Sequence, residues 1–285
     1  MSTAIVTDSN CGITPAEARE LGIFVVPMPF FIDGELFYEG INLSQAEFFR
    51  RMGSGADITT SQPTPGDVLN KWDEALEAHG ELVYIPMSSS LSGECATARM
   101  LAEDYDGRVV VADNLRISAT QRISVLDAAA MAARGKSAAA IAEALEREKL
   151  EASIYITVDT LKYLKRGGRI TPAAAAFGTV LGIKPVLQIQ GGKLDALTMS
   201  HGIRAAKRAM LDAVEHDLLT RFAGKDGVFV EAAYSCSEEE AAEWADEIRA
   251  RFGERFDGYI APLSLSIACH TGPGGFGVGC VKRLA

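Results

Sequence analysis

Short, almost entirely apolar segments recur through the first half of the chain and constrain its fold more than any other feature. A strand that alternates apolar and polar residues leaves one face in water, whereas a continuously apolar strand is typical of a sheet covered on both faces. The strands expected on this basis cover residues 4–6, 23–26, 82–86 and 109–112. Helical segments separate them, and strands that alternate with helices are typical of parallel α/β sheets.

Helix-start and helix-stop signals mark the intervening segments. Thr14-Pro15-Ala16-Glu17 supplies an N-cap hydroxyl, a proline at the first helical position and a glutamate that can close a capping box, and Gly22 ends that helix. Ser44 and Thr64 begin two further helices in the same manner. The sequence therefore predicts an N-terminal three-layer parallel-sheet domain over residues 1–152.

The pattern changes near residue 153. Strands expected at 186–189 and 193–199 flank Gly191-Gly192, which is the pattern of a β-hairpin. Further helices and strands are expected at 202–221, 227–232, 237–252 and 258–263. These elements predict a C-terminal two-layer α/β domain with a mixed sheet over residues 153–285.

Composition narrows the function by exclusion. The 285 residues include 38 acidic and 28 basic side chains, for a net charge of -10, and such a protein repels nucleic acid and anionic membrane surfaces. The five cysteines include no Cys-x-x-Cys pair, so neither a disulfide framework nor a zinc site is indicated. No apolar run reaches the roughly 18 residues that a membrane helix needs, and no signal-peptide pattern precedes the first strand. We expect a cytoplasmic protein without metal or cofactor.

Four clusters of small and polar residues lie where the chain is expected to turn. They occupy residues 59–63, 88–93, 165–169 and 270–274. Hydroxyls, glycine amides, arginine and histidine bind carboxylates and phosphates through fixed hydrogen bonds. Together the clusters predict an anion-binding pocket.

Each cluster also has a structural explanation. Ser92 can be a helix N-cap, Gly167-Gly168 a helix C-cap, and the segment after His270 a plain turn. Asp8-Ser9, after the first strand, is expected to cap or order a loop. Gly-x-Ser-x-Gly, phosphate-loop and dinucleotide motifs are absent from the sequence, which argues against those enzyme classes. A triad of Ser92, His270 and Asp113 stays open on sequence alone.

Taken in order along the chain, these segments resemble the DegV family. The matching stretches are residues 5–9, 60–63, 88–93, 159–170, 182–185 and 270–274. The most specific of them read YLKRGGR and HTGPG, and the resemblance spans nearly the whole chain.

The resemblance implies a two-domain α/β protein that holds a long-chain fatty acid between its domains and has no catalytic activity of its own. It further implies a bacterial fatty acid kinase system, in which this chain is the fatty-acid-binding subunit. A partner kinase uses ATP to phosphorylate the bound carboxylate, and the acyl phosphate then serves phospholipid synthesis.

The same resemblance assigns roles to individual residues. Those expected to bind the carboxylate are Thr60, Ser92, Arg169 and His270. Those expected to support the site are Ser61, Gly93 and Gly272. Arg204 matches an arginine implicated in docking the kinase.

The chain departs from the family pattern at three places. Asn10-Cys11-Gly12 follows the first motif, Glu94 stands where threonine is usual, and Tyr234-Ser235-Cys236 replaces a stretch that often contains histidine. Glu94 matters most, because a carboxylate one turn from an anion site repels the ligand unless it points outward.

The chemistry of a fatty acid suits the expected residues. Burial of about fourteen methylenes at about 0.8 kcal/mol each supplies roughly 11 kcal/mol before association costs. Two hydroxyls and an arginine offset the desolvation of the carboxylate. His270, protonated or donating, suits the added phosphate, so we expect Arg169 and His270 to matter more for the acyl phosphate than for the free acid. The alternatives are a stand-alone hydrolase or small-molecule kinase that uses Ser92 and His270, and a lipid-responsive regulatory protein.

Overall fold

The computed structural model describes residues 2–176 and 182–284, and the chain divides into two compact units. The first unit comprises Met1–Leu150, Ser264–Ser266 and Leu284–Ala285. The second unit comprises Glu151–Leu263 and Ile267–Arg283.

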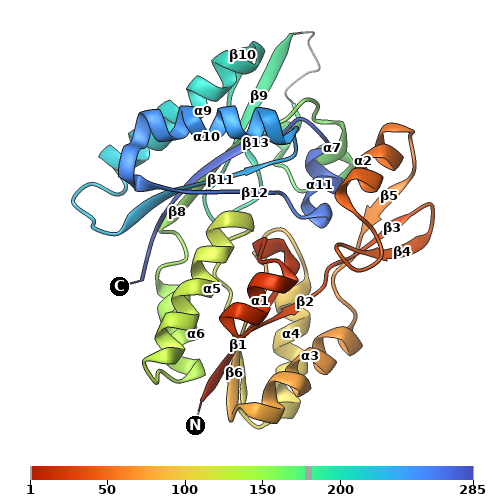
Figure 1. Cartoon of the computed structure of the whole chain (residues 1–285), viewed down its shortest axis with the longest axis vertical. Helices are drawn as coiled ribbons and strands as arrows, with labels where there is room; N and C mark the ends of the chain where they lie inside the picture. The colour runs from red at the N-terminus through yellow and green to blue at the C-terminus, as the bar shows by residue number, and fades with distance from the viewer. Residues whose placement is uncertain (1, 177–181, 285) are drawn as a thin grey trace. The chain divides into compact units, whose positions relative to one another are not determined.

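The first half of the chain alternates strands and helices as expected (Figure 1). Its elements are β1 (Thr3–Asp8), η1 (Ser9–Cys11), α1 (Pro15–Leu21), β2 (Ile23–Val26), β3 (Pro29–Ile32), β4 (Glu35–Tyr38), α2 (Gln45–Gly53), β5 (Ile58–Thr60), α3 (Pro65–Ala78), β6 (Glu81–Ile85), α4 (Glu94–Ala102), η2 (Glu103–Tyr105), β7 (Val109–Val111), α5 (Ser118–Ala133) and α6 (Ala138–Arg147). Thr14, Ser44 and Thr64 cap their helices with side-chain oxygens, as the sequence predicted. The main sheet has the order β2-β1-β6-β7, and all its pairings are parallel.

Helices cover both faces of this parallel sheet. Side chains alternate along each strand, so Ile5 and Val83 belong to one apolar cluster, with residues of α1, α5 and α6. Val6 and Tyr84 belong to a second cluster, with residues of α3 and α4. The predicted three-layer arrangement is therefore confirmed, because both faces of the strands are buried.

A second, small sheet in the first unit was not predicted. It is antiparallel, with the order β4-β3-β5, and its strands have only three or four residues. Phe30 is fully buried in it and meets Phe48 of α2 edge to face, with ring centroids 5.6 Å apart. Phe30 also pairs with Thr60, so this sheet fixes the position of one predicted site residue.

The second half of the chain forms a six-stranded sheet and its helices. The elements are β8 (Ala152–Thr157), α7 (Lys162–Gly167), α8 (Pro172–Ala175), β9 (Ile183–Ile189), β10 (Asp195–His201), α9 (Gly202–Leu219), β11 (Val228–Tyr234), α10 (Glu238–Phe252), η3 (Gly253–Arg255), β12 (Phe256–Pro262), α11 (Leu265–Thr271) and β13 (Phe276–Lys282). The sheet order is β10-β9-β8-β13-β11-β12. Only β11 and β12 pair in parallel among these neighbours, so the sheet is mixed, and the predicted hairpin is the antiparallel pair β9–β10.

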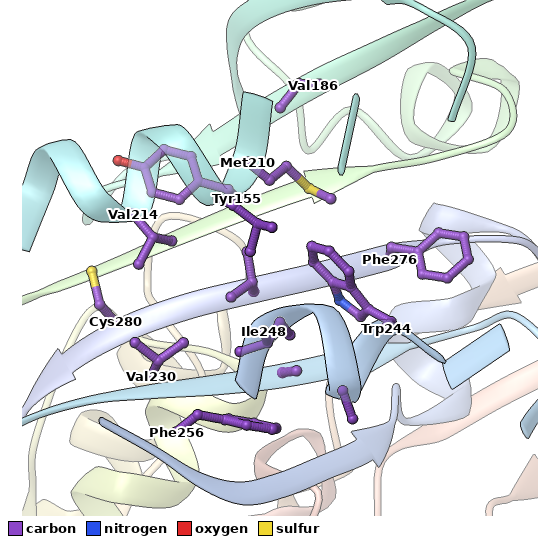
Figure 2. Packing of buried hydrophobic residues seen from close by; sticks show 14 of the residues in the cluster. Tyr155, Val186, Met210, Val214, Val230, Trp244, Ile248, Phe256, Phe276 and Cys280 are labelled. Atoms are coloured by element: carbon purple, nitrogen blue, oxygen red, sulfur yellow. The ribbon is translucent and has the colours of Figure 1, made fainter. Parts of the chain in front are cut away.

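The core of the second unit lies between this sheet and helices α9 and α10 (Figure 2). Trp244 of α10 is fully buried, meets Phe276 edge to face and donates from Nε1 to the carbonyl oxygen of Gly277 at 3.1 Å. Met210 and Val214 of α9 belong to the same cluster. The indole N–H of Trp244 is thus hydrogen-bonded although the side chain is fully buried.

Four of the five cysteines are buried, and none is in a disulfide. Within residues 2–176 and 182–284, no group of three or more metal-ligating side chains occurs. The helices in that part of the chain also include none that is long and apolar enough to cross a bilayer.

Candidate functional site

The serine-rich turn follows strand β6 at the carboxyl edge of the parallel sheet, where open α/β sheets bind ligands. The backbone amide of Ser88 donates to Arg116 O at 2.8 Å, and the amide of Ser92 donates to Ser88 O at 3.2 Å. The Oγ atom of Ser92 accepts the N–H of Glu94 at 3.2 Å. Helix α4 has Gly93 at its N-cap and no side-chain cap, so Ser92 orders the helix start from one residue further away. Ser92 itself is half-buried.

The segment that contains Thr60 lies against the start of the same helix. Thr60 is the last residue of β5 and is half-buried, whereas Ser61 is exposed. Two residues later, Gln62 Nε2 donates to Thr97 Oγ1 at 3.0 Å. A Cβ atom added to Gly93 would lie 3.2 Å from Gln62 Oε1. The structure thus brings the segments of Thr60 and Ser92 together around the first turns of α4.

Two buried carboxyl groups adjoin this hydroxyl-bearing turn. Asp8 accepts the amide of Met87 at 2.5 Å, the amide of Asn10 at 2.8 Å and Gln121 Nε2 at 3.2 Å. These bonds confirm its predicted loop-ordering role, and burial raises its pKa to about 6. Glu94 is also buried, and burial together with the charge of Asp8 raises its pKa well above the ordinary value. Its side chain points into the protein and contacts the hydroxyl of Tyr84.

In the second unit, Arg169 follows the end of helix α7. Gly168 adopts the left-handed conformation at φ 68° and caps the helix by donating to Leu164 O and Lys165 O, as the sequence predicted. Arg169 Nη1 donates to Gly167 O, and the Arg169 carbonyl accepts the amide of Leu194 at 3.0 Å. The guanidinium is therefore held close to the helix end, and Arg169 is half-buried.

His270 lies in the last turn of α11, a helix that the sequence did not predict, and the predicted turn follows it. The imidazole packs directly on the backbone of Gly167, because a Cβ atom there would lie less than 3.0 Å from Nδ1. Burial and the charges of Arg169 and Arg166 lower the pKa of His270 to about 4. The imidazole is therefore neutral near pH 7, and of the two forms expected from the sequence the neutral hydrogen-bond donor is favoured.

Sequence reasoning missed the residue that orders the turn after His270. Ser235 Oγ donates to Gly272 O at 2.7 Å and accepts the amide of Gly275 at 3.0 Å. The Ser235 backbone bonds the same turn twice, to Gly274 and Gly275. The only signal was the departure from the family pattern at 234–236. That departure gave no indication of a turn almost forty residues away in the sequence.

Glycine at two positions allows the same turn to contact neighbouring side chains. A Cβ atom on Gly272 would lie 2.5 Å from the ring of Tyr163, and one on Gly274 would lie 2.5 Å from Asp159 Oδ2. Asp159 in turn accepts Lys184 Nζ at 2.6 Å. These neighbours come from the segments 159–170 and 182–185, so the structure places both segments beside the turn after His270.

The predicted site residues thus fall into two clusters. The hydroxyl cluster, formed by Thr60, Ser92 and their turns, belongs to the first unit. The cationic cluster, formed by Arg169, His270 and the turn after His270, belongs to the second unit. Arg204 lies apart from the cationic cluster in sequence, exposed in the first turn of α9. Hydroxyl donors, a guanidinium and a neutral imidazole are suited to binding an anion rather than to nucleophilic attack.

Comparison with known proteins supplies relatives of nearly equal length. The family model described as "Uncharacterised protein, DegV family" matches residues 2–283. A DegV domain-containing protein of Deinococcus radiodurans is 34% identical over 282 residues, which are 98% of each chain.

Two solved structures extend the comparison. A fatty-acid-binding DegV family protein from Thermus thermophilus is 31% identical, with a TM-score of 0.88 over 99% of this chain and 100% of that chain. DegV of Bacillus subtilis, described as a fatty acid binding protein, is 28% identical, with a TM-score of 0.82 over the same fractions of the two chains.

Proposed function

The chain belongs to the DegV family, and from this premise we propose that it binds a long-chain fatty acid and presents the carboxylate to a partner kinase. The observation that carries the proposal is the similarity over 99% of the chain to the Thermus thermophilus protein, whose structure is described by its fatty acid binding. The kinase would transfer a phosphoryl group from ATP to the carboxylate, and this chain would act as a non-catalytic carrier.

In this proposal the two clusters serve the same carboxylate. Thr60 and Ser92 donate their hydroxyl protons to its oxygens, and Arg169 neutralises its charge. The neutral imidazole of His270 donates one N–H, which suits a carboxylate and, after phosphorylation, the added phosphate. Hydrogen bonds to a charged group contribute about 1.5–3 kcal/mol each, so three or four of them offset much of the desolvation of the head group.

The hydrocarbon tail would supply most of the affinity. Each methylene removed from water contributes about 0.8 kcal/mol, whereas association costs at least about 4 kcal/mol. Short-chain acids should therefore bind weakly even when the head group is fully hydrogen-bonded. Because the tail supplies most of the affinity, we expect substitutions of the residues that bind the head group to alter the position of the carboxylate as well as the affinity.

Mass spectrometry of the intact protein under non-denaturing conditions tests fatty-acid binding. Protein purified from cells should carry an added mass that matches a long-chain fatty acid. Ser92→Ala and Arg169→Ala should each lower the affinity for an added fatty acid by about tenfold, the loss of one charged hydrogen bond. Ser89→Ala is the matched control, because Ser89 lies in the same turn with an exposed side chain. Lipid-free protein that does not bind added fatty acid would refute the proposal.

The kinase step needs a second assay with the partner kinase and ATP. Formation of acyl phosphate on the wild-type carrier supports presentation, and binding without phosphorylation would favour a regulatory protein instead. Arg204→Ala should slow phosphorylation while leaving fatty-acid affinity unchanged. Arg208→Ala, one turn further along the same helix and also exposed, is the control for charge alone.

A further inference from the structure

The buried carboxyl group of Glu94 is the feature of the first unit that the proposed function leaves unused. Glu94 is the first residue of α4, yet its side chain is only 2% exposed, whereas glutamates in first helical turns usually face water. Its Oε1 atom contacts the hydroxyl of Tyr84. Its Oε2 atom is buried and has no hydrogen-bond partner among residues 2–176 and 182–284.

No positively charged side chain in the part of the chain that the structure describes offsets the charge of an ionised Glu94. Tyr84 and Trp72, whose rings meet edge to face with centroids 5.4 Å apart, belong to the apolar cluster on this face of the sheet. The titratable groups around it are Asp8 of β1, Tyr84 of β6 and Cys95 of α4. Glu94 forms no ion pair with any residue that the structure describes, and among the same residues the donors to Asp8 are neutral N–H groups.

Ionising both Asp8 and Glu94 would cost a large amount of free energy, because both carboxyl groups are buried. An ionised carboxylate in an apolar setting needs several donors or a cation, and a second negative charge nearby adds to the penalty. Asp8 has three N–H donors, whereas Glu94 has one phenol. The proton therefore stays on Glu94. The Tyr84 hydroxyl donates to Oε1, and a proton on Oε2 makes Glu94 a neutral acid, which is much less costly to bury than an anion.

The backbone of Glu94 connects this buried group to the proposed site. Its N–H donates to Ser92 Oγ at 3.2 Å, so that bond occupies an acceptor position of the hydroxyl and leaves the Ser92 O–H proton for an external acceptor. A shift of the first turn of α4 would move this N–H and therefore change the direction in which Ser92 donates.

We propose that Glu94 is a positioning residue for Ser92 that acts as a neutral acid, anchoring the start of α4 through Tyr84 without placing negative charge beside the bound carboxylate. The role rests on the proposed function, since Ser92 matters only if an anion binds there. It explains how glutamate can stand where the family usually has threonine: the side chain is directed inward and uncharged, so it does not repel the ligand.

Infrared spectroscopy of lipid-free protein tests the protonation state without any ligand. The difference spectrum between wild type and Glu94→Gln at about pH 7 to 8, where an ordinary glutamate is fully ionised, should show loss of a protonated carboxyl C=O band. Loss of carboxylate bands instead would overturn the proposal. This result is independent of fatty-acid binding, so it separates a failure of this inference from a failure of the proposed function.

Fatty-acid affinity tests the positioning role. Glu94→Gln, a neutral isostere, should change the affinity by less than about threefold at every pH from about 6 to 8, whereas Glu94→Ala should lower it by about tenfold. Tyr84→Phe should also weaken binding, because it removes the anchor and keeps the ring. Glu103→Ala, an exposed glutamate just after α4, is the control, and thermal melts show whether each variant is folded.

Two outcomes of the affinity assay would overturn the positioning role. Tighter binding by Glu94→Gln that grows with pH would show that the wild-type group is charged. Unchanged binding by folded Glu94→Ala would show that the side chain does not position Ser92.

Discussion

The hydroxyl cluster and the cationic cluster both hold potential hydrogen-bond donors in place, but they differ in the groups that surround those donors. The hydroxyl cluster sits at the carboxyl edge of a parallel sheet, and buried carboxyl groups adjoin its turn. The cationic cluster relies on contacts with glycine backbone, which bring an imidazole and a guanidinium close to one helix end.

The two arrangements shift the pKa values of their buried groups in opposite directions. In the hydroxyl cluster burial favours the protonated, neutral form of acids and raises the pKa of Asp8. In the cationic cluster burial and neighbouring arginines favour the neutral form of a base and lower the pKa of His270. His270 is therefore uncharged near pH 7, whereas Asp8, with a pKa of about 6, is mostly ionised there, and the guanidinium of Arg169 carries positive charge in the cationic cluster.

The largest effect is expected from Gly167→Ala, which attacks the glycine packing of the cationic cluster. The added methyl group would occupy the position of the His270 ring, so the imidazole must move and fatty-acid affinity should fall by about tenfold or more. Unfolding free energy should drop by up to about 3 kcal/mol. Gly192→Ala, where nothing lies within 4 Å of the added atom, is the matched control in denaturant titrations. Equal behaviour of the two variants would disprove the close contact.

Ser235→Ala should have the next largest effect, about 1–3 kcal/mol of stability, because it leaves a buried carbonyl and a buried amide of the turn without their side-chain partner. The expected consequence is a less ordered turn after His270 and weaker ligand binding. Ser54→Ala, which removes an exposed serine hydroxyl bonded to the end of α2, provides the comparison. Identical melting temperatures for the two would contradict the ordering role of Ser235.

The stability contributions of His270 and Asp8 should change with pH in opposite directions. The pKa of His270 is lowered from 6.5 to about 4, so the unfolded chain binds more protons and the contribution of His270 is lost as pH falls through that interval. The pKa of Asp8 is raised from 3.8 to about 6, so its contribution is present at low pH and lost as pH rises through about 6.

Comparison of each variant with wild type isolates these contributions. The stability advantage of wild type over His270→Gln should shrink as pH falls from about 6.5 to 4, and its advantage over Asp8→Asn should grow over the same interval, each by about 1–3 kcal/mol. Urea titrations across this range measure both. Slopes of the same sign would show that the clusters do not differ in the way described.

The smallest effect is expected from Thr97→Val, which removes the hydrogen bond from Gln62 while keeping the shape of the side chain. The half-buried position limits the cost to about 0.5–1 kcal/mol. Hydrogen exchange at residues 60–62 should nevertheless increase, because this bond ties that segment to α4. Unaltered exchange there would mean that β5 pairing alone positions Thr60.

Much of the fold was predictable because its signals are local. Continuous apolar runs, capping residues such as Thr14 and the glycine stops depend on a few adjacent residues, and the structure places those strands and helices close to the expected positions. The three short strands of the small sheet were missed, and two of them, β4 and β5, contain polar residues that interrupt the apolar runs on which the strand predictions rested.

The sequence by itself determined the two-layer and three-layer architectures and helix caps such as Thr14 and Gly168, because each depends on a few adjacent residues. The donors assigned to the two clusters follow from motifs and stay a prediction. Only the tertiary structure decided that Glu94 turns inward, that Ser235 holds the turn after His270, and that His270 rests on Gly167. These facts depend on contacts between segments distant in sequence, and burial at such contacts sets the charge of each group. No local pattern encodes which atoms will meet there.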